Sequence, residues 1–285
     1  VGEIKNLTNL VKPNVAAITN VSSGHLQGLR NTDSIADEKG DILEFYDSNG
    51  IAVLPRDSSY FKFWCSKTNG KKVVSFGMHE DSDFKVMNPS IDIENNLTSF
   101  QLMHDGLIEE CLINGVGIHN TLNAAMGLAI CSVLGIEISE VKDALHNVNF
   151  PERRLSIHKS IANSILIDDS YNSNPASMKR SIDLIASMNN YKKICLFGAM
   201  KELADDSSSL HSDIYEYAKD KIDYFYCLGE EWNCIQDPDN TNFKIFLSHE
   251  ELYESSKNLI NLDTVTLVKG SRSTRMDIVA DKLKN

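Results

Sequence analysis

The chain has 285 residues, 42% of them hydrophobic and 24% charged, which is typical of a globular protein with room for two domains. Its formal net charge of −12 argues against nucleic acid and membranes as partners, because a surface that binds either of them needs clustered positive charge. The six cysteines lack CxxC spacing and no signal peptide or long apolar segment is evident, which indicates reduced thiols in a cytoplasmic protein.

Over the first 76 residues the apolar pattern alternates between helix and strand. It predicts a short helix through Ile4, Leu7 and Val11, a strand over 15–20, a helix over 32–46 and strands over 51–55 and 71–76. Buried strands separated by helices imply a parallel α/β layer.

Residues 83–113 show a different pattern, with three strand-like segments separated by Asn95-Asn96 and Asp105-Gly106. Such turn residues between short strands predict a small antiparallel meander. Two helices should follow, over about 119–134 and 138–147. The first has an apolar face made of Leu122, Ala125, Met126, Ala129, Ile130, Val133 and Leu134.

The segment Pro151–Arg154 resembles a hinge, and the strand–helix alternation restarts after it. Strands are predicted over 164–168, 192–197, 224–228, 243–247 and 264–268, with helices between them. The expected organisation is one α/β domain over 1–150 and a Rossmann-like, doubly wound domain over 151–285.

In the first domain, two side chains that can carry chemistry are Lys39 and His25. Lys39 lies on the apolar stripe of the 32–46 helix, where desolvation should lower its pKa; the alternative is a lysine whose stem lies along the surface. His25 follows a buried strand, a position suited to metal binding or proton transfer, although a lone loop histidine is more often only solvated.

Polar side chains also gather near three predicted helix starts. Asn120 and Asn123 open the 119–134 helix, where they suit a polar ligand such as an adenine edge or simple capping. In ILIDDSYNSNPASM (165–178), Asp168 and Asp169 close a strand, and a polar loop with Tyr171 and Asn172 precedes Asn174-Pro175, which predict a helix start.

The third helix start is TLVKGSRSTRM (266–276), which runs from a strand into a helix. Lys269, Ser271 and Arg272 suit a carboxylate or phosphate there, and Gly270 permits close backbone approach. This segment lacks Walker A spacing, and GxxxxGK[ST] occurs nowhere in the chain.

Several of these segments together resemble the Mur ligase family. They are HLQGL, ADEKGDI, GIHNTLNAA, RRL, DDSYNSNPASM and LVKGSRSTRM, in the family's order, and they cover essentially the whole chain. The last two are most similar to the branch that joins D-alanyl-D-alanine to UDP-N-acetylmuramoyl-tripeptide. The resemblance implies a central ATPase domain, truncated at its N-terminus, followed by the C-terminal Rossmann-like domain.

The resemblance also implies roles for individual residues. His25 matches a magnesium ligand, and Lys39 matches a lysine that is carbamoylated and supports that metal. Asn120 and Asn123 match the adenine contact region, Arg154 a hinge arginine that reaches the phosphates, and Asp169 the ribose ligand, with Tyr171 and Asn172 beside it. Lys269, Ser271 and Arg272 match a segment that faces the peptide or dipeptide substrate.

The implied chemistry is an ATP-dependent, magnesium-supported amide ligation in peptidoglycan precursor synthesis, carried out by a monomer. The tripeptide carboxylate would attack the γ-phosphate of ATP, and the amine of D-alanyl-D-alanine would then displace phosphate from the acyl phosphate.

The sequence departs from the family at three places. The P-loop lysine and an acidic metal ligand expected before Gly2 are missing, GAMKELA (198–204) replaces GDMxELG, and Glu152-Arg153 replace Pro-Gly. The chain alone is therefore expected not to hydrolyse ATP. Two alternatives remain: another ligase of the superfamily, such as a folylpolyglutamate synthetase, and a non-catalytic binding module without a P-loop.

Overall fold

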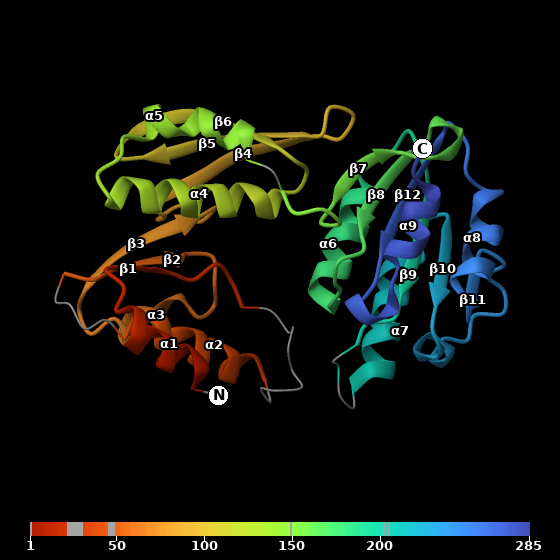
Figure 1. Ribbon diagram of the computed structural model, residues 1–285, viewed down its shortest axis with the longest axis horizontal. Helices are drawn as coiled ribbons and strands as arrows, with labels where there is room; N and C mark the ends of the chain where they lie inside the picture. The colour runs from red at the N-terminus through yellow and green to blue at the C-terminus, as the bar shows by residue number, and fades with distance from the viewer. Residues whose placement is uncertain (1, 22–30, 45–48, 149, 202, 204–205) are drawn as a thin grey trace. The chain divides into compact units, whose positions relative to one another are not determined.

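The computed structural model describes residues 2–21, 31–44, 49–148, 150–201, 203 and 206–285 (Figure 1). The described chain forms two compact units, one ending at Phe150 and the other comprising Pro151–Asn285. Within the described residues, no helix has both the length and the apolar character needed to cross a membrane.

The first unit is built on one mixed six-stranded sheet in the order β1-β2-β3-β4-β5-β6. The pairs from β1 to β4 are parallel, and β4, β5 and β6 pair antiparallel, which confirms both predicted strand patterns and joins them in one sheet. Its elements are α1 (Glu3–Val11), β1 (Val15–Ala17), α2 (Thr32–Gly40), η1 (Asp41–Leu43), β2 (Ile51–Pro55), α3 (Phe61–Lys67), β3 (Lys72–Gly77), β4 (Phe84–Asp92), β5 (Leu97–His104), β6 (Leu107–Asn114), α4 (Ile118–Val133), α5 (Ile138–Val141) and η2 (Lys142–Asn147).

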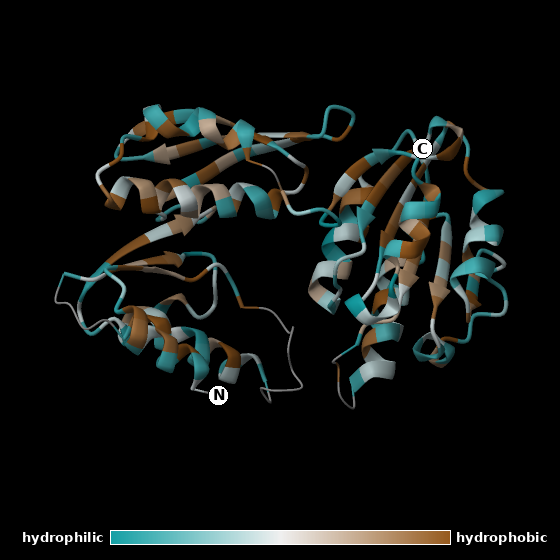
Figure 2. Cartoon of the chain, in the orientation of Figure 1, coloured by the Kyte–Doolittle hydropathy of each residue, from teal (hydrophilic) through white to brown (hydrophobic). Residues whose placement is uncertain are grey.

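Helices cover both faces of this sheet (Figure 1). Ala125 and Leu128 of α4 pack with Phe100 of β5 in one buried cluster, whereas Ala36 of α2 and Trp64 of α3 belong to a cluster on the other face. The strands carry much of the hydrophobic sequence, as Figure 2 shows. Burial of these apolar side chains is the main favourable contribution to the stability of the unit.

Several predicted bounds in the first unit were wrong. The helix predicted over 32–46 ends at Gly40 and continues as a short 3₁₀ turn, because the Lys67 ammonium bonds the carbonyl of Asp37 and the carboxylate of Asp41 at the end of the helix. The first strand covers only Val15–Ala17, and Leu134, assigned to the apolar face of α4, is 62% exposed just beyond the helix.

The second unit has a sheet in the order β11-β10-β9-β12-β8-β7. All neighbours from β11 to β8 are parallel, as predicted, while β7 adds an antiparallel edge that the sequence did not reveal. Its elements are β7 (Ser156–Lys159), η3 (Ile161–Asn163), β8 (Ile165–Asp169), α6 (Pro175–Ala186), β9 (Lys192–Gly198), α7 (Ser207–Ala218), β10 (Tyr224–Leu228), η5 (Glu230–Cys234), β11 (Phe243–Phe246), α8 (His249–Lys257), β12 (Thr264–Lys269), η6 (Arg272–Thr274) and α9 (Asp277–Leu283).

The helices of the second unit form two layers around the sheet, with α6 and α7 on one face and α8 and α9 on the other (Figure 1). This is the doubly wound arrangement expected for a Rossmann-like domain. It places the carboxyl ends of β8, β12 and β9 side by side, since β12 lies between the other two. Ligands of such sheets bind at this edge.

Candidate functional site

The ends of β8 and β12 carry the charged pair Asp169 and Lys269. The two residues are direct partners in the parallel register, so their side chains lie on the same face of the sheet. Nζ of Lys269 lies 2.6 Å from Oδ2 of Asp169 and also donates to the carbonyl of Asn172, at 3.0 Å. Lys269 is 2% exposed, so its ammonium group is buried in the interior of the fold.

The Asp169 carboxylate receives further hydrogen bonds from the protein. The Ser181 hydroxyl donates to Oδ2 at 2.8 Å, and the backbone N–H of Leu155 donates to Oδ1 at 3.3 Å. A buried carboxylate requires such compensation because the loss of hydration is costly. These contacts tie the chain after the domain boundary, helix α6 and strand β12 to the end of β8.

Ser271 joins three loops at the same edge. Its hydroxyl accepts a hydrogen bond from the backbone N–H of Lys201 at 2.8 Å and lies 3.5 Å from the hydroxyl of Ser173. Its own N–H donates to the carbonyl of Ala199 at 3.2 Å. The loops after β8, β9 and β12 are therefore held together through one buried serine.

Gly270 and Gly198 approach each other closely beside this serine. A Cβ added at Gly270 would lie 2.9 Å from the Cα of Gly198 and still closer to Thr274 and Met276. The close backbone approach expected at Gly270 is confirmed, because any side chain there would collide with the backbone at the end of β9.

Behind these loops lies His211, which the sequence analysis did not identify. Its Nε2 accepts from the backbone N–H of Met200 at 3.0 Å, and its Nδ1 lies 2.7 Å from the carbonyl of Ser207, which fits a neutral ring protonated at Nδ1. Burial lowers the pKa of His211 below its usual value. The spacing of His211 with Ile214, Tyr215 and Ala218 on one face of α7 was the signal that marks it as a core position.

Three of the predicted site residues, Arg154, Tyr171 and Arg272, come together at the surface of this edge. The guanidinium carbons of Arg154 and Arg272 lie 4.5 Å and 5.9 Å from the centre of the Tyr171 ring. Both distances are within the range of cation–π attraction. Tyr171 is 44% exposed, so this cluster is open to solvent.

The loop after Tyr171 leads directly into helix α6. Asn172 Oδ1 accepts from the N–H of Ser173, and Asn174 caps the helix in a reciprocal capping box with Ser177, with Pro175 at the first helical position. The predicted helix start is confirmed. The helix after β12, α9, begins only at Asp277, with Met276 as its N-cap and no side-chain cap.

In the first unit, Lys39 is half-buried on α2. Its Nζ donates to the carbonyl of Asn20 at 2.7 Å, and burial lowers its pKa, as the sequence predicted. The helix is anchored by Trp64, whose indole N–H donates to the carbonyl of Ala36 at 2.9 Å. His25, the proposed partner of Lys39, lies outside the described residues.

A magnesium ligand set is not assembled by the part of the chain that the structure describes. No group of three or more His, Cys, Asp or Glu side chains suited to a metal occurs there. The described residues alone therefore do not fit a magnesium site, and Lys39 as a free amine adds no anionic ligand.

Asn120 and Asn123 lie at the start of α4. The side chain of Asn120 is 7% exposed and donates from Nδ2 to the carbonyl of Val116 at 2.9 Å, whereas Asn123 is exposed one turn later. Gly117 is the N-cap and no side chain caps the helix. Simple capping, the alternative explanation for these asparagines, therefore does not account for them.

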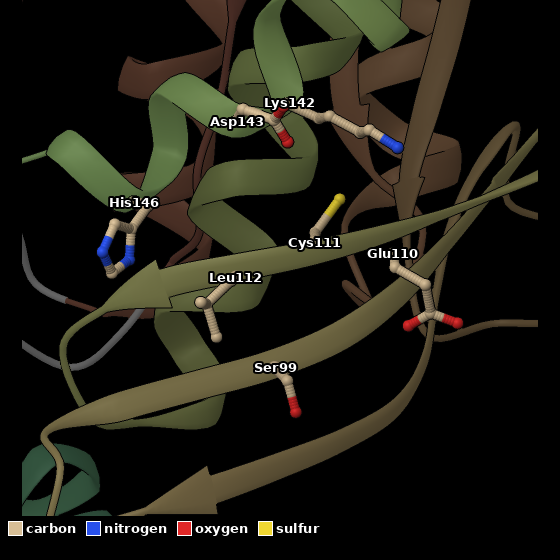
Figure 3. Close-up of a pocket in the computed structure, with 7 residues that line it drawn as sticks. All are labelled: Ser99, Glu110, Cys111, Leu112, Lys142, Asp143 and His146. Carbon is tan, nitrogen blue, oxygen red and sulfur yellow. The ribbon is translucent and has the colours of Figure 1, made fainter.

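A separate surface pocket of about 420 Å³ lies on the first unit beside β5, β6 and η2 (Figure 3). Burial raises the pKa of Cys111, which lines it, to about 12, so this thiol is a poor nucleophile at neutral pH. Lys142 is paired with Glu109. The lining contains none of the predicted site residues, so we assign no site to it.

Comparison with known proteins places both units in one family. The sequence matches the Mur ligase middle domain over residues 1–131 and the Mur ligase glutamate ligase domain over residues 153–272. It is 30% identical over 287 aligned residues to the UDP-N-acetylmuramoyl-tripeptide–D-alanyl-D-alanine ligase of Escherichia coli K12, covering 99% of this chain and 63% of that protein.

Solved structures give the same result. The fold is similar to that of MurF from Acinetobacter baumannii, with a TM-score of 0.88, 25% identity and coverage of 99% of this chain and 62% of that one. MurF ligase from Thermotoga maritima in complex with ADP has a TM-score of 0.85 at 22% identity, covering 99% of this chain and 64% of that one. The chain thus spans less than two thirds of the length of these relatives. Since the two domain matches occupy most of its residues, the chain belongs to the Mur ligase family, of which it carries the middle and C-terminal domains.

Proposed function

We propose that this chain is the middle and C-terminal part of an ATP-dependent ligase that joins D-alanyl-D-alanine to UDP-N-acetylmuramoyl-tripeptide in peptidoglycan precursor synthesis. The observation that carries this proposal is its 30% identity, over nearly its whole length, to the Escherichia coli enzyme of that name. The joined strand-end loops of the second unit support it, because they bring together candidate residues that the sequence distributes over more than 100 positions.

ATP is assigned to polar residues of both units. The start of α4 would hold the adenine through Asn120 and Asn123, with the Asn120 amide oxygen as acceptor because Nδ2 bonds the chain. Asp169, Tyr171 and Asn172 would line the ribose side. The Thermotoga maritima relative was solved with ADP, which supports an adenine nucleotide as ligand. The boundary at Phe150 and Pro151 supports the assignment of one domain to each unit.

The proposed reaction has two balanced steps. A carboxylate oxygen of the tripeptide attacks the γ-phosphorus of ATP, and the bond from that phosphorus to the β–γ bridging oxygen breaks. This step forms an acyl phosphate and releases ADP. The amine of D-alanyl-D-alanine then attacks the acyl carbon, loses a proton, and phosphate leaves from the tetrahedral intermediate. Arg154 is exposed beside Tyr171 and would stabilise negative charge on the transferring phosphoryl group.

Magnesium remains part of this proposal through two residues. His25 would be one ligand, and Lys39, once carbamoylated, would become an anion that supports the metal. The lowered pKa and half-buried position of Lys39 favour that modification, since carbamoylation requires the free amine. When bound, the ion would neutralise phosphate charge.

The segment after β12 is assigned to the peptide or dipeptide substrate. Arg272 is exposed and would contact it directly, whereas Lys269 and Ser271 are buried and would act by holding the loops after β8 and β9. The cytoplasm is the proposed location, supported by six cysteines that form no disulfide. We further expect a monomer.

A substrate panel tests the function. The complete protein, incubated with ATP, magnesium and UDP-N-acetylmuramoyl-tripeptide, should release phosphate and form a pentapeptide with D-alanyl-D-alanine, but not with D-glutamate or L-alanine. Phosphate release stimulated by a folate and glutamate would instead identify the folylpolyglutamate alternative. Nucleotide binding without any product from any acceptor would identify the non-catalytic module.

A further inference from the structure

Tyr171 holds two arginines that come from distant parts of the second unit. Arg154 follows the domain boundary and Arg272 follows β12, yet both guanidinium groups lie within 6 Å of the same ring, at 4.5 Å and 5.9 Å. Two like charges would otherwise repel each other, and the electron-rich face of a tyrosine offsets part of that cost. The ring is therefore a platform for a pair of cations.

The backbone around Arg154 is fixed by contacts on both sides. Arg153 and Leu155 both have left-handed conformations, with φ of 65° and 55°, which is unfavourable for side chains other than glycine. The N–H of Tyr171 donates to the carbonyl of Arg153 at 3.0 Å, and the N–H of Leu155 donates to Asp169. These hydrogen bonds hold the backbone on both sides of Arg154 in its unfavourable conformation, which places the Arg154 side chain over the ring. Such strained backbone is common at functional sites.

Among the described residues, no carboxylate lies within 4.0 Å of the Arg154 guanidinium, and Asp277 is the one that reaches Arg272, at 4.0 Å. That carboxylate already pairs with Arg153 at 3.2 Å and with Arg275 at 3.0 Å, so it compensates the charge of Arg272 only weakly. Two exposed guanidinium groups with so little compensation from the described residues are suited to an external anion.

We propose that Arg154 and Arg272 form one binding subsite for a doubly charged phosphate group and that Tyr171 is the positioning residue that holds both arginines in place. A phosphate monoester carries nearly two negative charges at neutral pH, so it matches two guanidinium groups better than a singly charged carboxylate does. This inference rests on the proposed function and deepens it, since it gives Arg272, in the segment assigned to the substrate, a phosphate group as a further ligand.

Inorganic tripolyphosphate tests the subsite in the 285-residue chain by calorimetry. Tyr171→Phe keeps the ring and should bind within about twofold of the original chain, whereas Tyr171→Leu should bind about tenfold more weakly, as expected for the loss of about 1.4 kcal/mol of positioning. Tyr217→Leu is the matched control, because two cations, Lys179 and Lys221, also lie close to the ring of Tyr217, which is far from this cluster in sequence. The affinity of this variant for tripolyphosphate should equal that of the original chain.

A double-substitution cycle separates one shared subsite from two independent arginines. Arg154→Gln and Arg272→Gln should each remove most of the affinity lost in the double variant, and their coupling should disappear in the Tyr171→Leu background. Any one of four results would overturn the inference. The two arginine substitutions could give additive losses of affinity, or Tyr171→Leu and Tyr171→Phe could bind tripolyphosphate equally well. The original chain could fail to bind tripolyphosphate, or acetate could displace the bound tripolyphosphate as readily as phosphate does. Failure of ligation in the substrate panel, with these affinities as expected, would refute only the proposed function.

Discussion

At the scale of single residues, the ion pair of Lys269 and Asp169 is a buried contact that joins the carboxyl ends of β8 and β12. We predict that Lys269→Met lowers the free energy of unfolding of the second unit by about 3–5 kcal/mol, because it leaves the Asp169 carboxylate buried without its cation. Lys282→Met, which removes a surface pair with Glu250, should cost about 0–1 kcal/mol. Denaturant titration followed by the fluorescence of Trp232, the tryptophan of this unit, measures the free energy of unfolding of both variants. Equal losses of stability would show that the buried pair contributes no more than the surface pair.

Arg153 occupies a left-handed position where related sequences are expected to have glycine. Its unfavourable backbone is offset by ion pairs with Asp277 at 3.2 Å and Asp281 at 3.0 Å. We predict that Arg153→Ala loses the pairs and keeps the strain, so that Arg153→Gly is more stable than Arg153→Ala by about 1 kcal/mol. At the exposed helical residue Arg180 the order should reverse, with alanine more stable than glycine. The same order at both positions would argue against backbone strain at Arg153.

The neutral His211 gives the second unit a pH dependence. Burial holds its pKa below the usual 6.5, so as the pH falls below that value the unfolded chain takes up a proton before the folded one does. Nearby Glu231 opposes this effect and Lys201 adds to it. Unfolding free energy should therefore fall as the pH drops from 6.5 toward the lower folded-state pKa, and His211→Gln should show a shallower fall. His158, whose pKa is also lowered by burial, contributes to the remaining slope. Identical slopes for the original chain and His211→Gln would exclude His211 as a contributor.

At the scale of elements, the start of α6 couples helix stability to the site. Asn174→Ala removes the capping box and should cost about 1 kcal/mol, and so should Ser248→Ala, which removes the side-chain cap of α8. Only Asn174→Ala should also weaken binding of tripolyphosphate, since the loop that it anchors carries Tyr171. Thermal unfolding and calorimetry of the two variants measure the difference; equal effects on binding would show that α6 has no special connection to the subsite.

The sequence predicted elements well where apolar periodicity was strong. All five parallel strands of the second sheet and the antiparallel meander of the first were found, because their apolar runs are bounded by turn residues such as Asp105-Gly106, whose φ values of 47° and 78° fit a tight hairpin. Helix α3 was missed, since Trp64 is its one buried residue, and so was β7, a short polar edge strand. Both are defined by tertiary contacts rather than by local pattern.

The site was predictable as a set of residues but not as a set of contacts. Charged residues at the ends of two apolar strands, Asp169 and Lys269, were visible in the sequence, but their pairing depends on β12 lying next to β8 across a sequence separation of 100. The same holds for the two arginines at Tyr171. His211 carried only the signal of a polar residue on an apolar helix face, which does not distinguish a supporting histidine from a catalytic one.

At the scale of the whole molecule, each unit has its own sheet and hydrophobic clusters, and the proposed reaction draws on both. Lys39 and Asn120 come from the first unit, and Arg154, Asp169 and Arg272 come from the second.

The transfer of oxygen from substrate to phosphate tests this account most directly. The complete protein would be given UDP-N-acetylmuramoyl-tripeptide labelled with ¹⁸O in the terminal carboxylate, together with ATP, magnesium and D-alanyl-D-alanine, and the released phosphate would be analysed by mass spectrometry. An acyl-phosphate route predicts that one labelled oxygen appears in each phosphate formed and that product and phosphate accumulate equally. Unlabelled phosphate, or phosphate formed without the pentapeptide product, would contradict the proposed ligase chemistry.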